Sequence, residues 1–334
     1  MNGPHDGTLV VDELPLSAGT ALPGARLRYR TMGSAARDAG GRIVNAVLLL
    51  HGTTGSSEQF LRAEFASAMF GSGQPLDVRR WFVVMPDALG HGLSSKPSDG
   101  LFGKFPAYGY RDMVSAQHLL CTRLGIDRLR LVLGTSMGGM HTFLWAGLYP
   151  DRMDAAIAIA CEPAPVSGRN LLWRELIARA IRADPGWPSG DVGRASPGFQ
   201  AAWPVSALMY TTPTRLDHIG CAADALVEID AWMSSAPDPC DMAYALEASR
   251  DYDPVPLLRH IRVPLLWINF DDDEVNPREL RHNETAVSEA PTILPVDIAA
   301  GVETYGHQTL AHGNVYADQV AAFVAEKLSN HATH

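Results

Sequence analysis

An apolar run followed by a G-x-S-x-G turn constrains this chain more than any other feature of its sequence. Residues 131–135 predict a buried strand, Ser136 stands between Gly134 and Gly138, and the residues that follow predict a helix. The two glycines are required because a Cβ at either place would collide with the adjoining strand or helix. The pattern therefore predicts a nucleophile elbow, with Ser136 at a helix N-terminus where negative charge is stabilised.

Length and composition indicate a globular protein with a large core. Of the 334 residues 46% are hydrophobic, which suits one large domain with an insertion, or two domains. The 27 Lys and Arg residues against 37 Asp and Glu residues give a formal net charge of -10, so we expect neither nucleic acid nor a membrane as partner. Neither a signal segment nor a membrane-length apolar run is present, so we expect a cytoplasmic protein.

The order of apolar runs predicts an α/β fold with a mostly parallel central sheet and helices on both faces. Buried strands are expected at residues 43–50, 81–85, 131–135, 153–160, 263–270 and 292–296, after an antiparallel edge within residues 8–33. Between residues 167 and 252 the patterns are helical instead, at 171–182, 199–210 and 222–233. We therefore expect a core of residues 1–165 and 253–334 and an inserted helical cap of residues 166–252.

An acidic turn after the strand at 263–270 supplies the candidate acid of a catalytic triad. Active sites of open α/β sheets lie beyond the carboxyl ends of the strands, which is where Asp271, Asp272 and Asp273 stand. We favour Asp273, four residues before Pro277, with Asp272 as an open alternative and Asp271 as a poorer one.

Histidines after the last strand supply the candidate base. His307 follows a glycine in that loop, which is where this architecture places its base, and His312 is the competitor. His91 precedes the nucleophile, so we expect it to hold its loop instead. The order Ser136, Asp273, His307 is the order that this fold uses.

These residues predict acyl transfer through a covalent intermediate. His307 would take the proton of Ser136 during attack, and Asp273 would orient and stabilise the imidazolium. The expected oxyanion hole consists of the backbone N–H groups of Thr53, in the glycine-containing turn after residue 50, and of Met137. Water or an alcohol would then attack the acyl group. The four cysteines lack metal-ligand spacing, and we expect no metal and no cofactor.

Beyond this motif, the chain resembles the homoserine O-acetyltransferase family of α/β-hydrolases. The similar stretches are residues 105–106, 110–114, Gln117, 124–126, 134–140, 145–146, 149–150 and the cap segment 180–187. The resemblance implies the triad named above and acetyl transfer from acetyl-CoA by a ping-pong route. It also implies a helical cap that often forms a dimer interface, hence a possible homodimer.

Two departures from this family concern the substrate. Gln308 stands where the transferases carry an aspartate for the homoserine amino group, and Trp203 stands where they carry an arginine for its carboxylate. The residues expected to contact substrate are thus Trp203, Gln308, Thr54 and Tyr210. Because both charged partners of a zwitterion are lost, we expect a serine esterase that cleaves a small-molecule ester with a neutral acyl group. The alternative is an O-acyltransferase that moves acetyl from acetyl-CoA to an alcohol such as homoserine, and a third is a catalytically silent receptor.

Overall fold

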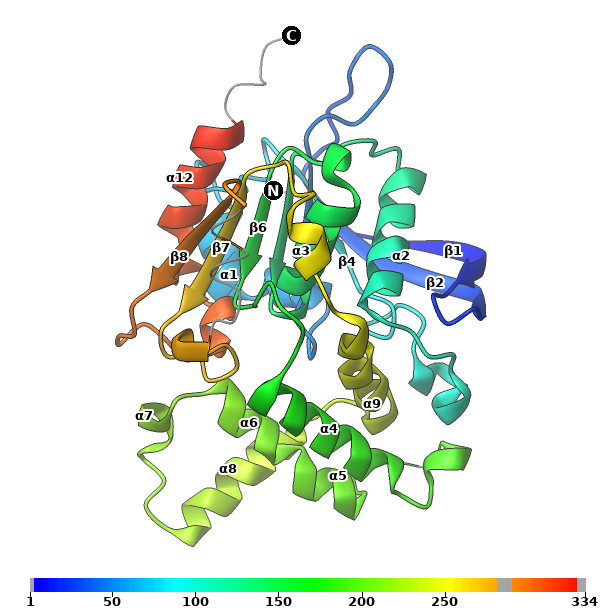
Figure 1. Ribbon diagram of the computed structural model, residues 1–334, viewed down its shortest axis with the longest axis vertical. Coiled ribbons are helices and arrows are strands. Elements are labelled where there is room, and N and C mark those ends of the chain that lie inside the picture. Colours follow the sequence, from blue (N-terminus) through cyan, green and yellow to red (C-terminus); the bar gives the residue numbers. More distant parts are fainter. Residues whose placement is uncertain (1–2, 191, 281–286, 288–289, 329–334) are drawn as a thin grey trace.

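The computed structural model describes residues 3–190, 192–280, 287 and 290–328. Its centre is an eight-stranded sheet in the order β1-β2-β4-β3-β5-β6-β7-β8 (Figure 1). β2 runs antiparallel to both β1 and β4, and the other neighbours pair in parallel, which confirms the predicted α/β class. The strands are β1 (His5–Pro15), β2 (Ala21–Met32), β3 (Ala46–Leu50), β4 (Phe82–Pro86), β5 (Leu131–Thr135), β6 (Ala156–Ile159), β7 (Leu265–Phe270) and β8 (Ile293–Ile298).

The central strands are apolar along their whole length because both faces of the sheet are covered. Every residue of β3 and β5 is buried. Alternate residues enter different hydrophobic clusters: Leu48 and Leu50 join one, Val47 and Leu49 the other. This is the period-two pattern of a strand between two helical layers.

Helices of the core pack on the two faces. On one face lie α2 (Tyr110–Arg123), α3 (Met137–Leu148) and α10 (Val255–Leu258), which bury residues in the first cluster. On the other face lie α1 (Ala63–Met69) and α12 (Ala317–Leu328), which contribute to the second. Within the described ranges, no helix is both long and apolar enough to cross a membrane.

A helical block follows β6 and precedes β7, and it lies at one end of the sheet (Figure 1). Most of its helices contribute to a third hydrophobic cluster, which includes Trp173, Phe199 and Trp203. The division into a core and a cap at residues 166 and 252 stays a prediction. The helices are α4 (Gly168–Arg182), α5 (Pro197–Ala202), α6 (Pro204–Tyr210), α7 (Pro213–Leu216), α8 (Ala222–Ser234) and α9 (Pro239–Glu247).

The single helix expected over residues 199–210 is wrong, because the structure divides it. α5 ends at Ala202 and α6 begins at Pro204, with Trp203 between them. Proline has no N–H to donate within a helix, and its ring collides with the preceding turn. Pro204 therefore stands where proline is tolerated, at the first position of a new helix.

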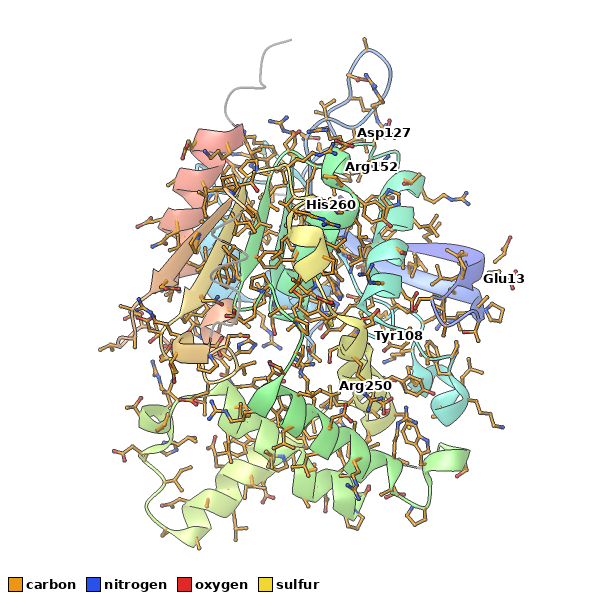
Figure 2. The ribbon with its side chains drawn as sticks, in the orientation of Figure 1. Glu13, Tyr108, Asp127, Arg152, Arg250 and His260 are labelled. Carbon is orange, nitrogen blue, oxygen red and sulfur yellow. The ribbon has the colours of Figure 1, made fainter. Side chains whose placement is uncertain are left out.

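The helical block between β6 and β7, called the cap below, lies on the side of the strand carboxyl ends. Asp127, Arg152 and His260 precede β5, β6 and β7, and Figure 2 places them together at the opposite end from the cap. Arg250, by contrast, lies close to α9. The loops that leave β3, β5, β7 and β8 therefore open toward the cap, as is usual for sites in open α/β sheets.

The turn between β5 and α3 has the strained geometry that the motif predicts. Ser136 has a φ of 53° and a ψ of -117°, a region that non-glycine residues rarely adopt. A Cβ on Gly134 would overlap the carbonyl of Gly138, and one on Gly138 would overlap the carbonyl of Leu50. These two positions therefore tolerate glycine alone.

Gly138→Ala should destabilise the fold, because the methyl group meets fixed backbone of β3. We expect the free energy of unfolding in urea to fall by about 3 kcal/mol. Gly301→Ala is the matched control, since no atom lies within 4 Å of its added Cβ, and it should change stability by less than about 0.5 kcal/mol. Equal losses in both variants would contradict this account of the turn.

Candidate active site

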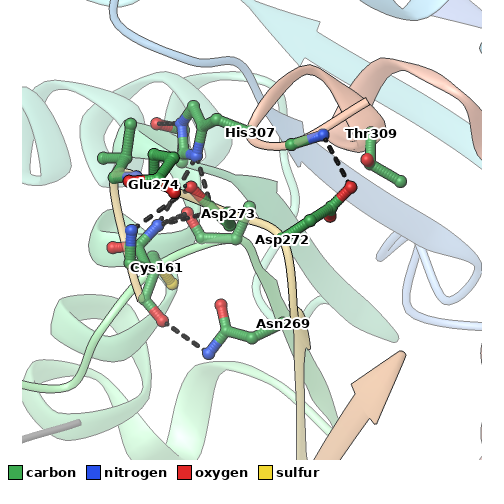
Figure 3. A network of polar contacts seen from close by, with 12 residues as sticks. Cys161, Asn269, Asp272, Asp273, Glu274, His307 and Thr309 are labelled. Carbon is green, nitrogen blue, oxygen red and sulfur yellow. Dashed lines mark hydrogen bonds and ion pairs between the residues drawn. The ribbon is translucent and has the colours of Figure 1, made fainter. Parts of the chain in front are cut away.

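Ser136, His307 and Asp273 lie in one chain of hydrogen bonds. The Oγ of Ser136 is 2.8 Å from Nε2 of His307, and Nδ1 of the same ring is 2.8 Å from Oδ2 of Asp273. The residues are 6%, 4% and 1% exposed, respectively. The sequence analysis named these three residues, and the structure brings them together from the loops after β5, β8 and β7. Figure 3 shows His307 beside Asp273.

Asp273 is held as an anion by the loop that follows it. Its Oδ1 accepts hydrogen bonds from the N–H groups of Val275 at 2.8 Å and Asn276 at 3.2 Å, and its Oδ2 accepts from the Asn276 side chain at 3.0 Å. Burial raises the pKa of Asp273, but His307 and these donors outweigh it, so the pKa lies below its usual value. An ionised carboxylate is what an imidazolium partner requires.

Sequence reasoning did not find Asn276. Its side-chain amide also donates to the carbonyl of Ala160 at 3.0 Å, at the end of β6. Ala160 has a φ of 54°, so its carbonyl turns out of the strand direction toward the loop. Asn276 thus ties the acid to the neighbouring strand. The only signal in the sequence is an asparagine three residues after the acid, a spacing typical of many turns.

The other two carboxylates of the acidic turn have different partners. Asp272 accepts hydrogen bonds from the Thr304 hydroxyl at 2.7 Å and from the Gly306 N–H at 3.3 Å. Asp271 pairs with Arg278 at 3.3 Å. Figure 3 shows the Asp272 carboxylate directed away from Asp273. Asp272 therefore fixes the loop in front of the histidine without contacting its ring.

The other candidate histidines are also engaged elsewhere. The ring of His312 stacks on Tyr305, with 4.0 Å between centroids. Nε2 of His91 lies 2.9 Å from the carbonyl oxygen of Thr53, and its Nδ1 lies 3.1 Å from that of Leu89. A neutral ring carries one N–H and donates to one of these carbonyls at a time. His91 thus contacts the loop after β3 at Thr53 as well as its own loop at Leu89, whereas the sequence analysis expected it to hold its own loop only.

Two backbone N–H groups are free to meet an oxyanion. Met137 is the first residue of α3, where an N–H has no partner inside the helix. Within the described part of the chain, the N–H groups of Thr53 and Met137 donate to no protein acceptor. Met137 is fully buried, and its side chain belongs to the first hydrophobic cluster.

A cavity of about 960 Å³ opens beside Ser136 and His307, and it is lined from the core and the cap. Tyr210 covers one face of the His307 imidazole, with 5.6 Å between ring centroids and 21° between their planes. All the residues expected to contact substrate line it, namely Thr54, Trp203, Tyr210 and Gln308.

The charge of the residues nearest the triad bears on whether a charged substrate can bind there. Trp203 is 7% exposed and stacks on Phe199, and Gln308 is exposed directly after His307. The buried cap cation Arg174 donates to Asn170 and is not among the residues that line the cavity. The cavity wall next to the triad is therefore uncharged at Trp203 and Gln308.

A nucleophile elbow and a Ser-His-Asp chain at the carboxyl ends of a mostly parallel sheet define an α/β-hydrolase site. The chain belongs to the alpha/beta hydrolase fold family, whose model matches residues 45–285, and it is an enzyme. It is similar to the homoserine O-acetyltransferase of Thermobifida fusca, 38% identical over 226 residues that cover 62% of this chain and 58% of that protein. The chain spans about half the length of the curated relatives it matches.

Solved structures of two kinds share the fold. The homoserine O-acetyltransferase of Bacillus anthracis superposes with a TM-score of 0.83 at 20% identity, covering 98% of this chain and 99% of that one. The acetyl esterase MekB superposes with a TM-score of 0.79 at 25% identity, covering 98% and 97%. The same architecture thus carries proteins named for transfer and for hydrolysis.

The buried His91 should make the fold sensitive to acid. Burial and the nearby His51 lower the pKa of His91 from 6.5 to about 4, so between these pH values the unfolded chain binds a proton that the folded chain does not. Stability is therefore lost as the pH falls from 6.5 to 4, by about 3 kcal/mol from this group. His91→Gln should reduce that loss, as measured by urea unfolding across the range.

His260→Gln is the matched control, because its ring is exposed at the far end of the sheet (Figure 2). This variant should keep the wild-type dependence of stability on pH. If His91→Gln and His260→Gln gave the same dependence, the buried ring would not be the acid-sensitive group.

Proposed function

We propose that this chain is an O-acyltransferase that moves an acyl group from a thioester to the hydroxyl of an alcohol through Ser136. The observation that carries the acyl-enzyme step is the hydrogen-bonded chain from Ser136 through His307 to Asp273 at the wall of a large cavity. The curated relatives are named homoserine O-acetyltransferase. That name supports an alcohol acceptor better than the ester hydrolysis that the sequence analysis placed first.

The geometry suits each proton transfer of this reaction. Nε2 of His307 accepts the serine proton as Oγ attacks the thioester carbonyl, and Asp273 stabilises the imidazolium through Nδ1–H. The N–H groups of Thr53 and Met137 donate to the oxyanion, each lowering the barrier by about 3 kcal/mol. The thiol leaves with the proton from His307. The acceptor hydroxyl then attacks the acyl group and gives its proton to the same nitrogen. The intermediate collapses by breaking its bond to Ser136 Oγ, which takes that proton back from His307 as the new ester leaves.

The proposed acceptor is an alcohol other than a zwitterion such as homoserine. Trp203 and Gln308 line the cavity beside the triad, and neither side chain carries a charge that could form an ion pair. At these two positions a zwitterionic acceptor would find no ion pair for its ammonium or its carboxylate, and an unpaired charge is costly where the wall is buried, as at Trp203.

Ester hydrolysis is the second candidate. The acetyl esterase MekB is 25% identical over 98% of this chain, and the uncharged Trp203 and Gln308 suit a neutral ester equally well. Hydrolysis uses the same acyl-enzyme, with water as the attacking group.

Release of CoA from acetyl-CoA separates the two candidates. The purified chain is incubated with acetyl-CoA alone, with homoserine, and with a series of uncharged alcohols, and the thiol is followed with a disulfide reagent. The transferase proposal predicts release that depends on an uncharged alcohol and that homoserine does not stimulate. Fast hydrolysis of p-nitrophenyl acetate or butyrate, with no effect of any alcohol, would establish the esterase instead.

Ser136→Ala should abolish either activity, with kcat reduced by about 10⁵-fold or more, because the acyl group then has no acceptor on the protein. An organophosphonate should label the wild type stoichiometrically at Ser136 and leave this variant unlabelled. A wild type that neither turns over these substrates nor reacts with the phosphonate would make the chain a receptor, and both candidates would be wrong.

Asp273→Asn should reduce kcat by about 10⁴-fold, because an amide favours the wrong tautomer of His307 and cannot stabilise its cation. Asp272→Asn is the matched control in the same turn, since that side chain bonds Thr304 and Gly306 but not the ring. We expect it to retain kcat within about tenfold. The reverse order of the two losses, measured under saturating substrate, would make Asp272 the acid.

A further inference from the structure

Gln59 joins the two backbone segments that carry the free N–H groups. It lies in a 3-10 turn, η1 (Ser57–Leu61), after the loop that follows β3. Its Oε1 accepts a hydrogen bond from the N–H of Gly52 at 3.1 Å, and its Nε2 donates to Oγ1 of Thr135 at 2.7 Å. Gly52 directly precedes Thr53, and Thr135 directly precedes Ser136. One side-chain amide therefore connects the loop after β3, which carries Thr53, to the nucleophile elbow, which carries Ser136.

The backbone itself does not provide this link. The β3–β5 ladder ends with the pair Leu50 and Gly134, two residues before Ser136. Within the described residues, the N–H of Gly52 reaches the side chain of Gln59 in place of a backbone carbonyl. A Cβ on Gly52 would lie 3.5 Å from that of Ser136, so the two segments are in contact without a ladder hydrogen bond to fix their spacing.

The turn that carries Gln59 is anchored independently of the site. The N–H of Ser57 donates to Asp87 at 2.7 Å, and Asp87 also accepts from the N–H of Leu93 at 2.8 Å. Phe60 is fully buried and packs edge-on against Phe65. The position of the Gln59 amide is thus set by the core.

Gln59 also lines the cavity, but its hydrogen-bonding groups are largely used by the protein. Its carbonyl oxygen holds Gly52 and one of its two amide hydrogens holds Thr135. This arrangement fits a side chain that acts through the backbone better than one that binds substrate.

We propose that Gln59 is a positioning residue that sets the distance between the Thr53 N–H and the Ser136–Met137 backbone. The inference rests on the proposed acyl transfer at Ser136. Oxyanion donors act at 2.7 to 3.1 Å, so a shift of about 1 Å in one of them lowers the rate by about 100-fold. Because the shift affects the tetrahedral intermediate more than bound substrate, the loss falls on kcat and leaves KM nearly unchanged.

Gln59→Met tests this directly, because methionine keeps the length of the side chain and removes both hydrogen bonds. We expect kcat for an acyl ester or thioester to fall by 10- to 100-fold, with KM within about threefold of wild type. Thr135→Val removes the bond from its other end and should lower kcat in the same direction. Since both changes break one bridge, the double variant should lose less than the product of the two single losses.

The inhibition constant of a trifluoromethyl ketone distinguishes a positioning role from a merely structural one, which would leave it unchanged. Its adduct with Ser136 carries an oxyanion, so its inhibition constant should rise in Gln59→Met by the factor by which kcat falls. Gln200→Met is the matched control, since Gln200 is exposed on α5 and is not among the cavity-lining residues. It should keep kcat, KM and the inhibition constant of the wild type.

The outcomes distinguish this inference from the proposed function. If the wild type turns over its substrate and both Gln59→Met and Thr135→Val keep wild-type kcat and inhibition constant, the positioning role is wrong and the acyl transfer stands. A rise in KM with kcat unchanged would make Gln59 a substrate contact and would also overturn the inference. If the wild type has no Ser136-dependent turnover, the proposed function and this inference fail together.

Discussion

The close approach of α3 to the ends of β3 and β5 is the constraint on which this site depends. It requires bare backbone at Gly134 and Gly138 and leaves Ser136 with a φ of 53°. Strain of this kind costs on the order of 1 to 3 kcal/mol and persists only where the surroundings over-determine it. Here the Ser136 N–H donates to the carbonyl of Ile159 on β6 at 2.8 Å, so the neighbouring strand fixes the turn.

Once Ser136 is fixed, the parallel sheet supplies its partners. The carboxyl ends of β3, β5, β7 and β8 face the same side, so the loops after them meet although they are far apart in the chain. Each loop is then held by short polar contacts of its own. His91 supports Thr53, Asp272 supports the turn before His307, and Asn276 supports Asp273. The geometry of Ser136, His307 and Asp273 thus depends on further polar residues that hold the loops in place.

The sequence predicts the residues that a motif or a loop position marks, and it misses those that only a contact in the folded chain identifies. Strand periodicity and the glycine spacing locate Ser136, and chain order with loop position selects Asp273 and His307. No motif or periodicity in the sequence marks Gln59. Its contact with Thr135 is a single side-chain hydrogen bond between residues 76 positions apart. The division of the helix at Pro204 could have been predicted from the sequence, since proline interrupts a helix locally.

The identity of the acceptor is a question of positioning rather than of triad chemistry. In the proposed mechanism, water and alcohol would attack the same acyl-enzyme, and His307 would accept the proton of either one. An alcohol competes with abundant water only if the protein holds its hydroxyl next to the acyl carbon, where orientation can be worth an effective concentration of 10⁵ M or more. The groups able to do so line the cavity outside the triad, on the cap at Trp203 and Tyr210 and on the core at Gln308. Under the proposed function, selectivity between transfer and hydrolysis would therefore depend on how closely the cap holds an alcohol over Ser136. A uniform gain in acyl-enzyme formation would favour neither acceptor.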